Sequence, residues 1–291
     1  MIETYLNSLS DDITTLDISG RSITSLPDLT RFKNLEKFNC SYNQLTSLTL
    51  PQNLQVLYCS NNQLTSLTLP QNLKIVHCDN NKLTSLTLPQ NLEVLYCYHN
   101  QLTSLTLPQN LESLSCYHNK LTSLTLPQNL KYLSCSHNQL TSLTLSQNLK
   151  IVHCYNNELT YLHTLPQNLQ VLNCSHNQLT SLTLPQNLQE LYCYRNQLTS
   201  LNLPQNLREL DYYNNPIYEI VNNDSLIKIK QNIQILNNFR YLYYCLKFKD
   251  QLRKWLWEKV REPKIKMTYH PNYLINLKED DDLDTFLDNW K

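Results

Sequence analysis

The chain has 291 residues and a formal charge of zero, because 24 basic residues balance 24 acidic ones. With 41% hydrophobic and 16% charged residues, it is neither disordered by charge nor uniformly basic in the manner of a nucleic-acid binder. Gly20 is the single glycine in the sequence, which excludes the glycine-rich phosphate loops of kinases, P-loop NTPases and Rossmann enzymes.

The N-terminal segment 1–12 is predicted to be a short helix that caps the following domain. Ile2, Tyr5, Leu6 and Leu9 recur in it at helical spacing. No basic residue precedes an apolar stretch here, and no run of about eighteen apolar residues occurs in the sequence, so neither a signal peptide nor a transmembrane helix is expected. We therefore expect a cytoplasmic location and reduced cysteines.

Residues 13–217 contain an internal repeat. Nine of the ten cysteines recur at intervals of 19 residues, with one interval of 20, at positions 40, 59, 78, 97, 116, 135, 154, 174 and 193. Around each lies the same string, typified by residues 54–72, LQVLYCSNNQLTSLTLPQN. One repeat cannot bury its own apolar side chains, so stacked repeats share a continuous core. The register extends back to Leu16 and forward to Ile217, which predicts eleven turns.

The string LxxLxCxxNxL resembles the leucine-rich repeat with cysteine in the third apolar position. Its form LPxxLxxLxxxxNxLTSL is similar to repeats of bacterial secreted effectors, and the cysteine substitution and the segment 269–277 resemble proteins of giant amoebal DNA viruses. The resemblance covers about residues 13–217 and implies an α/β solenoid, the leucine-rich repeat horseshoe, with a parallel inner sheet. Repeats of 19 residues leave no room for a full helix, so an irregular or 3₁₀ convex side is expected.

Catalysis is not predicted. Some effectors of this type carry a ubiquitin ligase domain with a catalytic Cys-x-Asp motif, but here Cys245 precedes Leu246 and Lys247, and 74 residues follow the repeats. The sequence has no nucleophile elbow or His-Glu-x-x-His motif either. We expect no enzyme, no catalytic residue, no cofactor and no small-molecule substrate.

Two columns of the repeat are assigned structural roles. The inward-facing cysteines are predicted to act as apolar filler, since no Cys-x-x-Cys pair occurs. An asparagine recurs where each strand ends, and its amide is expected to bond backbone groups of the turn. These asparagines are Asn43, Asn62, Asn81, Asn100, Asn119, Asn138, Asn157, Asn177, Asn196 and Asn215.

The variable strand positions are predicted to project from the concave face, where Tyr, His, Asn and Ser predominate. Such a mixture suits protein recognition. A half-exposed strand surface also favours these residues without any role in binding, which is the alternative interpretation. Tyr117 is expected to stack on Tyr98, and His99, His118 and His137 to form a similar ladder. A flat ladder does not offer the tetrahedron that zinc requires, so no metal site is expected. The predicted partner-binding residues are Tyr58, His77, Tyr96, Tyr98, His99, Tyr117, His118, His137, His153, Tyr155, Tyr192, Tyr194, Arg195 and Tyr213.

Residues 218–291 are predicted to form a helical C-terminal cap with an acidic tail. Asp224 and Ser225 are expected to cap a first helix, which carries Leu226, Ile229, Ile233 and Leu236. A second helix is expected from about residue 239 to 260. Its stretch 239–261 is basic and aromatic, and six acidic residues follow Lys278.

The sequence therefore predicts a non-enzymatic interaction module that binds an unidentified partner protein on its concave face. We expect the module in the cytoplasm, which is that of the host if this chain is viral or an effector. Two alternatives stay open. One is an adaptor or ligase-related effector that acts through the C-terminal region. The other is contact of the basic helix 239–261 with nucleic acid or a membrane, which the neutral net charge and the simpler role of a solvated capping helix disfavour.

Overall fold

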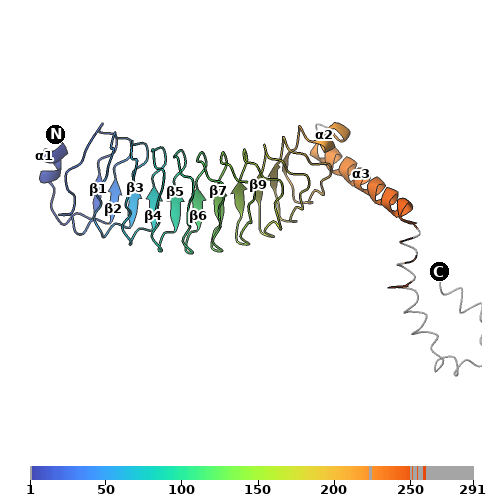
Figure 1. The fold of residues 1–291 in the computed structure, drawn as a ribbon, viewed down its shortest axis with the longest axis horizontal. Coiled ribbons are helices and arrows are strands. Elements are labelled where there is room, and N and C mark those ends of the chain that lie inside the picture. The colour runs from blue at the N-terminus through green and yellow to red at the C-terminus, as the bar shows by residue number, and fades with distance from the viewer. Residues whose placement is uncertain (1, 223–224, 250, 252–253, 255–257, 260–291) are drawn as a thin grey trace, which may run out of the picture. The chain divides into compact units, whose positions relative to one another are not determined.

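The computed structural model describes residues 2–222, 225–249, 251, 254 and 258–259 (Figure 1). The chain divides into two compact units, Met1–Ile233 and Gln234–Lys291. The first unit contains helix α1 (Ile2–Asn7), a β-sheet, helix α2 (Pro216–Ile220) and the beginning of helix α3 (Leu226–Lys247). The predicted division of the chain at residues 12 and 217 stays a prediction.

The sheet of the described chain has eleven parallel strands in sequence order, joined by ten pairings without a register shift, so each repeat contributes one strand. The strands are β1 (Thr15–Asp17), β2 (Lys37–Asn39), β3 (Val56–Tyr58), β4 (Ile75–His77), β5 (Val94–Tyr96), β6 (Ser113–Ser115), β7 (Tyr132–Ser134), β8 (Ile151–His153), β9 (Val171–Asn173), β10 (Glu190–Tyr192) and β11 (Glu209–Asp211). Their stacking confirms the predicted solenoid.

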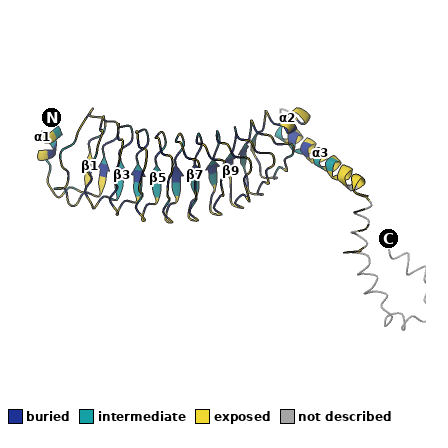
Figure 2. Ribbon diagram, in the orientation of Figure 1, coloured by how far each residue is buried: buried dark blue, intermediate teal, exposed yellow. Residues whose placement is uncertain are grey.

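Period-two alternation in each strand separates the core from the outer surface. In β5, Leu95 is buried while Val94 and Tyr96 are half-buried, and Cys97 returns to the core. Leucines from the return path, such as Leu92 and Leu102, complete the core of each turn. Figure 2 shows the resulting pattern of buried and half-buried positions along the strands.

The return path between strands is irregular, with no helix of either type in the described repeats, in agreement with the prediction. A turn forms at each Pro-Gln-Asn segment, where, for example, the Leu111 amide donates to the Pro108 carbonyl at 3.3 Å. The Asn110 side chain then donates to the carbonyl of Gln90 in the preceding repeat at 3.4 Å.

The asparagine column binds adjacent repeats together, as predicted. Oδ1 of Asn138 accepts the amide of Leu121 at 2.9 Å. Its Nδ2 donates to the carbonyls of Cys116 and Cys135, both at 3.1 Å, and to that of Ser136 at 3.2 Å. One buried side chain thus satisfies four backbone groups in two repeats, which water cannot reach.

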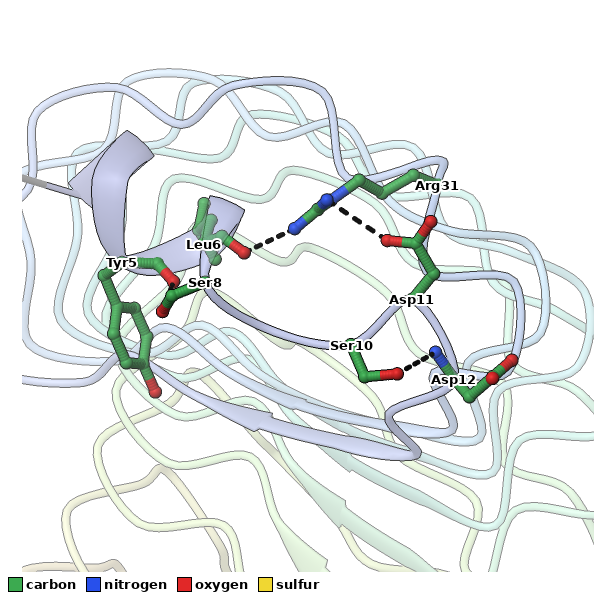
Figure 3. Close-up of polar contacts among 7 residues, drawn as sticks. All are labelled: Tyr5, Leu6, Ser8, Ser10, Asp11, Asp12 and Arg31. Atoms are coloured by element: carbon green, nitrogen blue, oxygen red, sulfur yellow. Dashed lines mark hydrogen bonds and ion pairs between the residues drawn. The ribbon is translucent and has the colours of Figure 1, made fainter.

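Helix α1 lies at the N-terminal end of the sheet, with Leu6 buried (Figure 1). Figure 3 shows Arg31 between two acceptors: it donates to the Leu6 carbonyl and forms an ion pair with Asp11 at 3.1 Å. The short helix ends where the Ser8 hydroxyl donates to the Tyr5 carbonyl at 2.7 Å. The cap is therefore fastened to the first turns of the solenoid by a charged side chain.

The other end of the sheet is covered by α2 and the first turns of α3. Ile229 and Ile233 of α3 are buried, and Lys230 Nζ donates to the carbonyls of Gln205 and Leu207, both at 2.9 Å. The Tyr212 hydroxyl donates to the Val221 carbonyl. These contacts lie within the first compact unit and match the expected cap.

The prediction of two separate C-terminal helices is wrong, because α3 runs without a break from Leu226 to Lys247. No proline or glycine lies between residues 236 and 239 to end the first helix, and Gln234 donates to Asn238 at 3.1 Å across the expected gap. The predicted Asp224 cap, the end of the second helix at residue 260 and the acidic tail lie outside the described residues.

Candidate functional site

Four columns of side chains form the outer surface of the sheet, here called the strand face. They are the first and third residues of each strand, the residue after the cysteine, and the residue after that. All fourteen predicted partner-binding residues lie in three of these columns. His99, His118, Arg195 and Tyr213 are exposed, and the remaining ten are half-buried.

In-register pairing of the strands stacks identical side chains. The Tyr98 and Tyr117 rings lie 4.3 Å apart at an interplanar angle of 8°. The His99 and His118 rings are 4.3 Å apart, and the His118 and His137 rings 3.9 Å apart, with interplanar angles of 11° and 12°. Both predicted ladders are confirmed.

Stacking extends to both sides of these ladders. His77 stacks on Tyr96 at 4.4 Å and meets Tyr58 edge to face at 4.8 Å. Near the C-terminal end, the Tyr194 and Tyr213 rings are parallel at 4.9 Å. The aromatic surface therefore reaches from β3 to the segment that follows β11.

Edge-to-face contacts join the tyrosine column to the histidine column of the preceding repeat. Tyr155 contacts His137 with 5.1 Å between ring centroids, and Tyr194 contacts His176 at 5.0 Å. The predicted set omitted His176, although it occupies the same slot as His137. It also omitted Tyr132, the first residue of β7, whose ring lies 6.2 Å from that of His153.

The histidine column has a backbone feature that the sequence pattern did not reveal. Its residues adopt left-handed φ angles of 49° to 57°, and Gly20 has a φ of 66° in the equivalent slot of the first repeat. This conformation is uncommon for residues other than glycine, asparagine and aspartate. The column comprises Tyr42, Asn61, Asn80, His99, His118, His137, Asn156, His176, Arg195 and Asn214.

Two histidines of the ladder, His118 and His137, have lowered pKa values. Loss of hydration lowers the pKa of His118, and the charges of His137 and His99 lower it further. The pKa of His137 is lowered for the same two reasons. These shifts favour the neutral form of His118 and His137, in which one ring nitrogen donates and the other accepts a hydrogen bond.

Asp79 interrupts the neutral surface and was not among the predicted site residues. It is 4% exposed, accepts the Ser60 hydroxyl at 2.6 Å and accepts Asn80 Nδ2 at 3.0 Å. Burial and the charge of this carboxylate together raise the pKa of the nearby Tyr98 hydroxyl. In the sequence, Asp79 stands out only as the single acidic residue in the column after the cysteine, which otherwise consists of Ser and Tyr.

The cysteine column is chemically inert. The nine repeat cysteines are free and buried, and burial raises the pKa of Cys40, Cys116 and Cys154 to about 12. A thiol with such a pKa holds almost no nucleophilic thiolate at neutral pH. These cysteines pack the core, as predicted.

No group of three or more His, Cys, Asp or Glu side chains in the described residues is placed to hold a metal ion. No helix of the described part is long and apolar enough to span a bilayer. Location in the cytoplasm stays a prediction.

Comparisons with known proteins agree with this geometry. The Leucine Rich Repeat family model matches residues 53–71 and 168–186, whereas no curated protein matches the chain. YopM from Yersinia enterocolitica is 30% identical over 72% of this chain and 57% of its own, with a TM-score of 0.59. The functional domain of InlJ from Listeria monocytogenes, which includes a cysteine ladder, is 29% identical over 76% of this chain and 57% of its own, with a TM-score of 0.65.

A second YopM structure, the leucine-rich effector protein from Yersinia pestis, is 30% identical, with a TM-score of 0.57, over 70% of this chain and 73% of that protein. The chain spans 57% of the length of the Y. enterocolitica YopM and InlJ chains. The likeness to bacterial effector repeats is thus confirmed, while a viral origin stays a prediction. With its in-register strands, asparagine column and buried cysteines, this chain belongs to the leucine-rich repeat family.

Proposed function

We propose that this chain is a non-enzymatic interaction module that binds a partner protein on its strand face. The observation that carries the proposal is the set of stacked aromatic side chains on this face, exemplified by Tyr98 on Tyr117 and His118 on His137. Stacking holds each ring in place, so binding a partner costs little further side-chain entropy. The hydroxyl and imidazole groups add hydrogen-bonding capacity without a fixed charge.

The proposal is tested by removing aromatic area from the strand face. Tyr96, Tyr98, Tyr117 and Tyr155 are changed together to Ala, and binding partners captured from lysate are compared with those of the wild type by mass spectrometry. These side chains are half-buried on the outer surface, so their loss opens no core cavity. Anchoring aromatic residues commonly cost about 2 kcal/mol each when truncated, and four such losses equal the ~8 kcal/mol of a micromolar complex.

The matched control changes Thr65, Thr84, Thr103 and Thr122 to Ala. These threonines are exposed, recur at the same interval of 19 residues and lie on the return path rather than on the strand face. We expect the control to capture the same partners as the wild type. Equal capture by the tyrosine variant would contradict the proposal.

A second candidate surface is the described part of α3 beyond residue 233. Its large side chains are exposed, with Phe239 at 66% and Tyr241 at 74%. Arg240, Lys247 and Lys249 accompany them, which supports an adaptor role or contact with nucleic acid or a membrane. Loss of capture after deletion of residues 239–291, with normal capture by the tyrosine variant, would assign recognition to this region.

A further inference from the structure

The charges of the strand face indicate the chemistry of its partner, an inference that rests on the proposed function. Carboxylates outnumber basic groups in the four columns: Asp17, Asp79, Glu190, Glu209 and Asp211 stand against Lys37 and Arg195. From β3 to β9 the strand face carries one formal charge, that of Asp79. The face as a whole is therefore complementary to a basic partner rather than an acidic one.

Asp79 lacks a cation of its own. Among the ion pairs of the described residues, none includes this carboxylate. Its two oxygens are instead held by neutral donors, the Ser60 hydroxyl at 2.6 Å and the Asn80 amide at 3.0 Å. The Asp79 carboxylate is 4% exposed, and its hydrogen-bond donors are neutral, so its negative charge is not balanced by them. A cation supplied by a partner can balance this charge.

The charge of Asp79 acts on the stacked rings of the next two repeats. In-register pairing places Tyr98 one strand spacing of ~4.8 Å from Asp79, and Tyr117 one spacing further. The negative face of an aromatic ring attracts a cation, and a carboxylate close to the ring adds to this attraction. The stacked Tyr98 and Tyr117 rings are thus the part of the strand face that favours a cation.

Among the described rings, only Tyr98 is stacked on Tyr117. Tyr117 stacks on Tyr98 and meets His99 and His118 edge to face, and no other described ring stacks on it. On its other side, one strand spacing of ~4.8 Å away, the tyrosine column continues with the small residue Ser136. Ser136 is fully buried, and its hydroxyl has no hydrogen-bond partner among the described residues.

We infer that the strand face recognises an arginine side chain of its protein partner, which stacks on the accessible part of the half-buried Tyr117 in the field of Asp79. Arginine fits better than lysine because its guanidinium is planar, stacks on aromatic rings and carries several donors for tyrosine hydroxyls. The partner segment is therefore basic.

A random peptide library displayed on phage tests this inference on the intact protein. We expect the enriched peptides to contain arginine more often than the unselected library. An enriched peptide should bind Asp79→Asn at least tenfold more weakly than the wild type, and its citrulline analogue, neutral but of the same shape, should bind the wild type at least tenfold more weakly. Glu158→Gln is the matched control, because it removes the same charge at an exposed position outside the strand face, and its affinity should stay within twofold.

If Asp79→Asn melts at a lower temperature than the wild type, Asp79→Ser replaces it, since serine holds this slot at Ser60 and Ser136. Enriched peptides without an arginine excess, unchanged affinity for the folded Asp79 variants, or a selection that enriches no peptide would overturn the inference. If the binding of the peptides depends on Tyr98 and Tyr117 but on neither Asp79 nor arginine, the inference is overturned and the proposed function is still supported. Peptides indifferent to both tyrosines would contradict the proposed function as well.

Discussion

Replacing Asn138 by Ala removes the side chain that joins two neighbouring repeats. The amide makes hydrogen bonds of 2.9 to 3.2 Å to the Leu121 N–H and to the carbonyls of Cys116, Cys135 and Ser136. The Leu121 N–H, left buried without a partner, costs about 1–3 kcal/mol. The Nδ2 group carries two hydrogens, so the loss of its bonds to the three carbonyls adds ~2 kcal/mol. Because Asn138 is buried, we expect its loss to lower the free energy of unfolding by about 3 to 5 kcal/mol.

Equilibrium urea unfolding, followed by circular dichroism, measures this change. Asn129→Ala is the control, because this exposed asparagine makes one hydrogen bond, to the Gln109 carbonyl at 3.1 Å. Its replacement is expected to cost less than about 1 kcal/mol, since water hydrates the carbonyl it leaves. Equal losses for the two variants would refute the assignment of solenoid stability to the buried asparagine column.

Three further outcomes are expected. The nine repeat thiols should react with a thiol reagent in denatured protein but not in native protein, since they are buried with raised pKa values, and equal labelling would contradict this. The free energy of unfolding should fall as the pH decreases below the ordinary histidine pKa of ~6.5, because the lowered pKa values make the folded state bind fewer protons than the unfolded state. In urea melts at several pH values, His118→Asn should reduce this dependence of the unfolding free energy on pH. Ser136→Ala should stabilise the fold by about 1 kcal/mol, because its buried hydroxyl has no partner among the described residues. Ser60→Ala should destabilise the fold, because it removes the hydrogen bond to Asp79. A melting temperature lowered in both variants would argue against this assignment.

The sequence alone determined the solenoid, because a period of 19 residues repeated many times permits few ways of burying its apolar positions. In-register stacking of identical repeats also made the Tyr98–Tyr117 and His99–His118–His137 ladders predictable, since the neighbour of each side chain is its own equivalent. The asparagine and cysteine columns followed from the same regularity.

Outside the repeat, prediction was weaker. The split of α3 into two helices was wrong because local apolar spacing does not show where a helix stops in the absence of proline or glycine. The left-handed backbone of the histidine column was also missed, since it is imposed by the turn between stacked repeats rather than by His99 or His118 themselves.

Tertiary structure alone decided which polar side chains have partners. Asp79 is a single letter in a column of serines and tyrosines, and only the fold places it under the Ser60 hydroxyl of one neighbouring repeat and beside Tyr98 of the other. Whether a carboxylate is buried, and whether a cation lies near it, depends on residues about 19 positions away on both sides. The repeat therefore determined the frame of this protein, and packing between repeats decided its electrostatics, because charge interactions act through space and not along the chain.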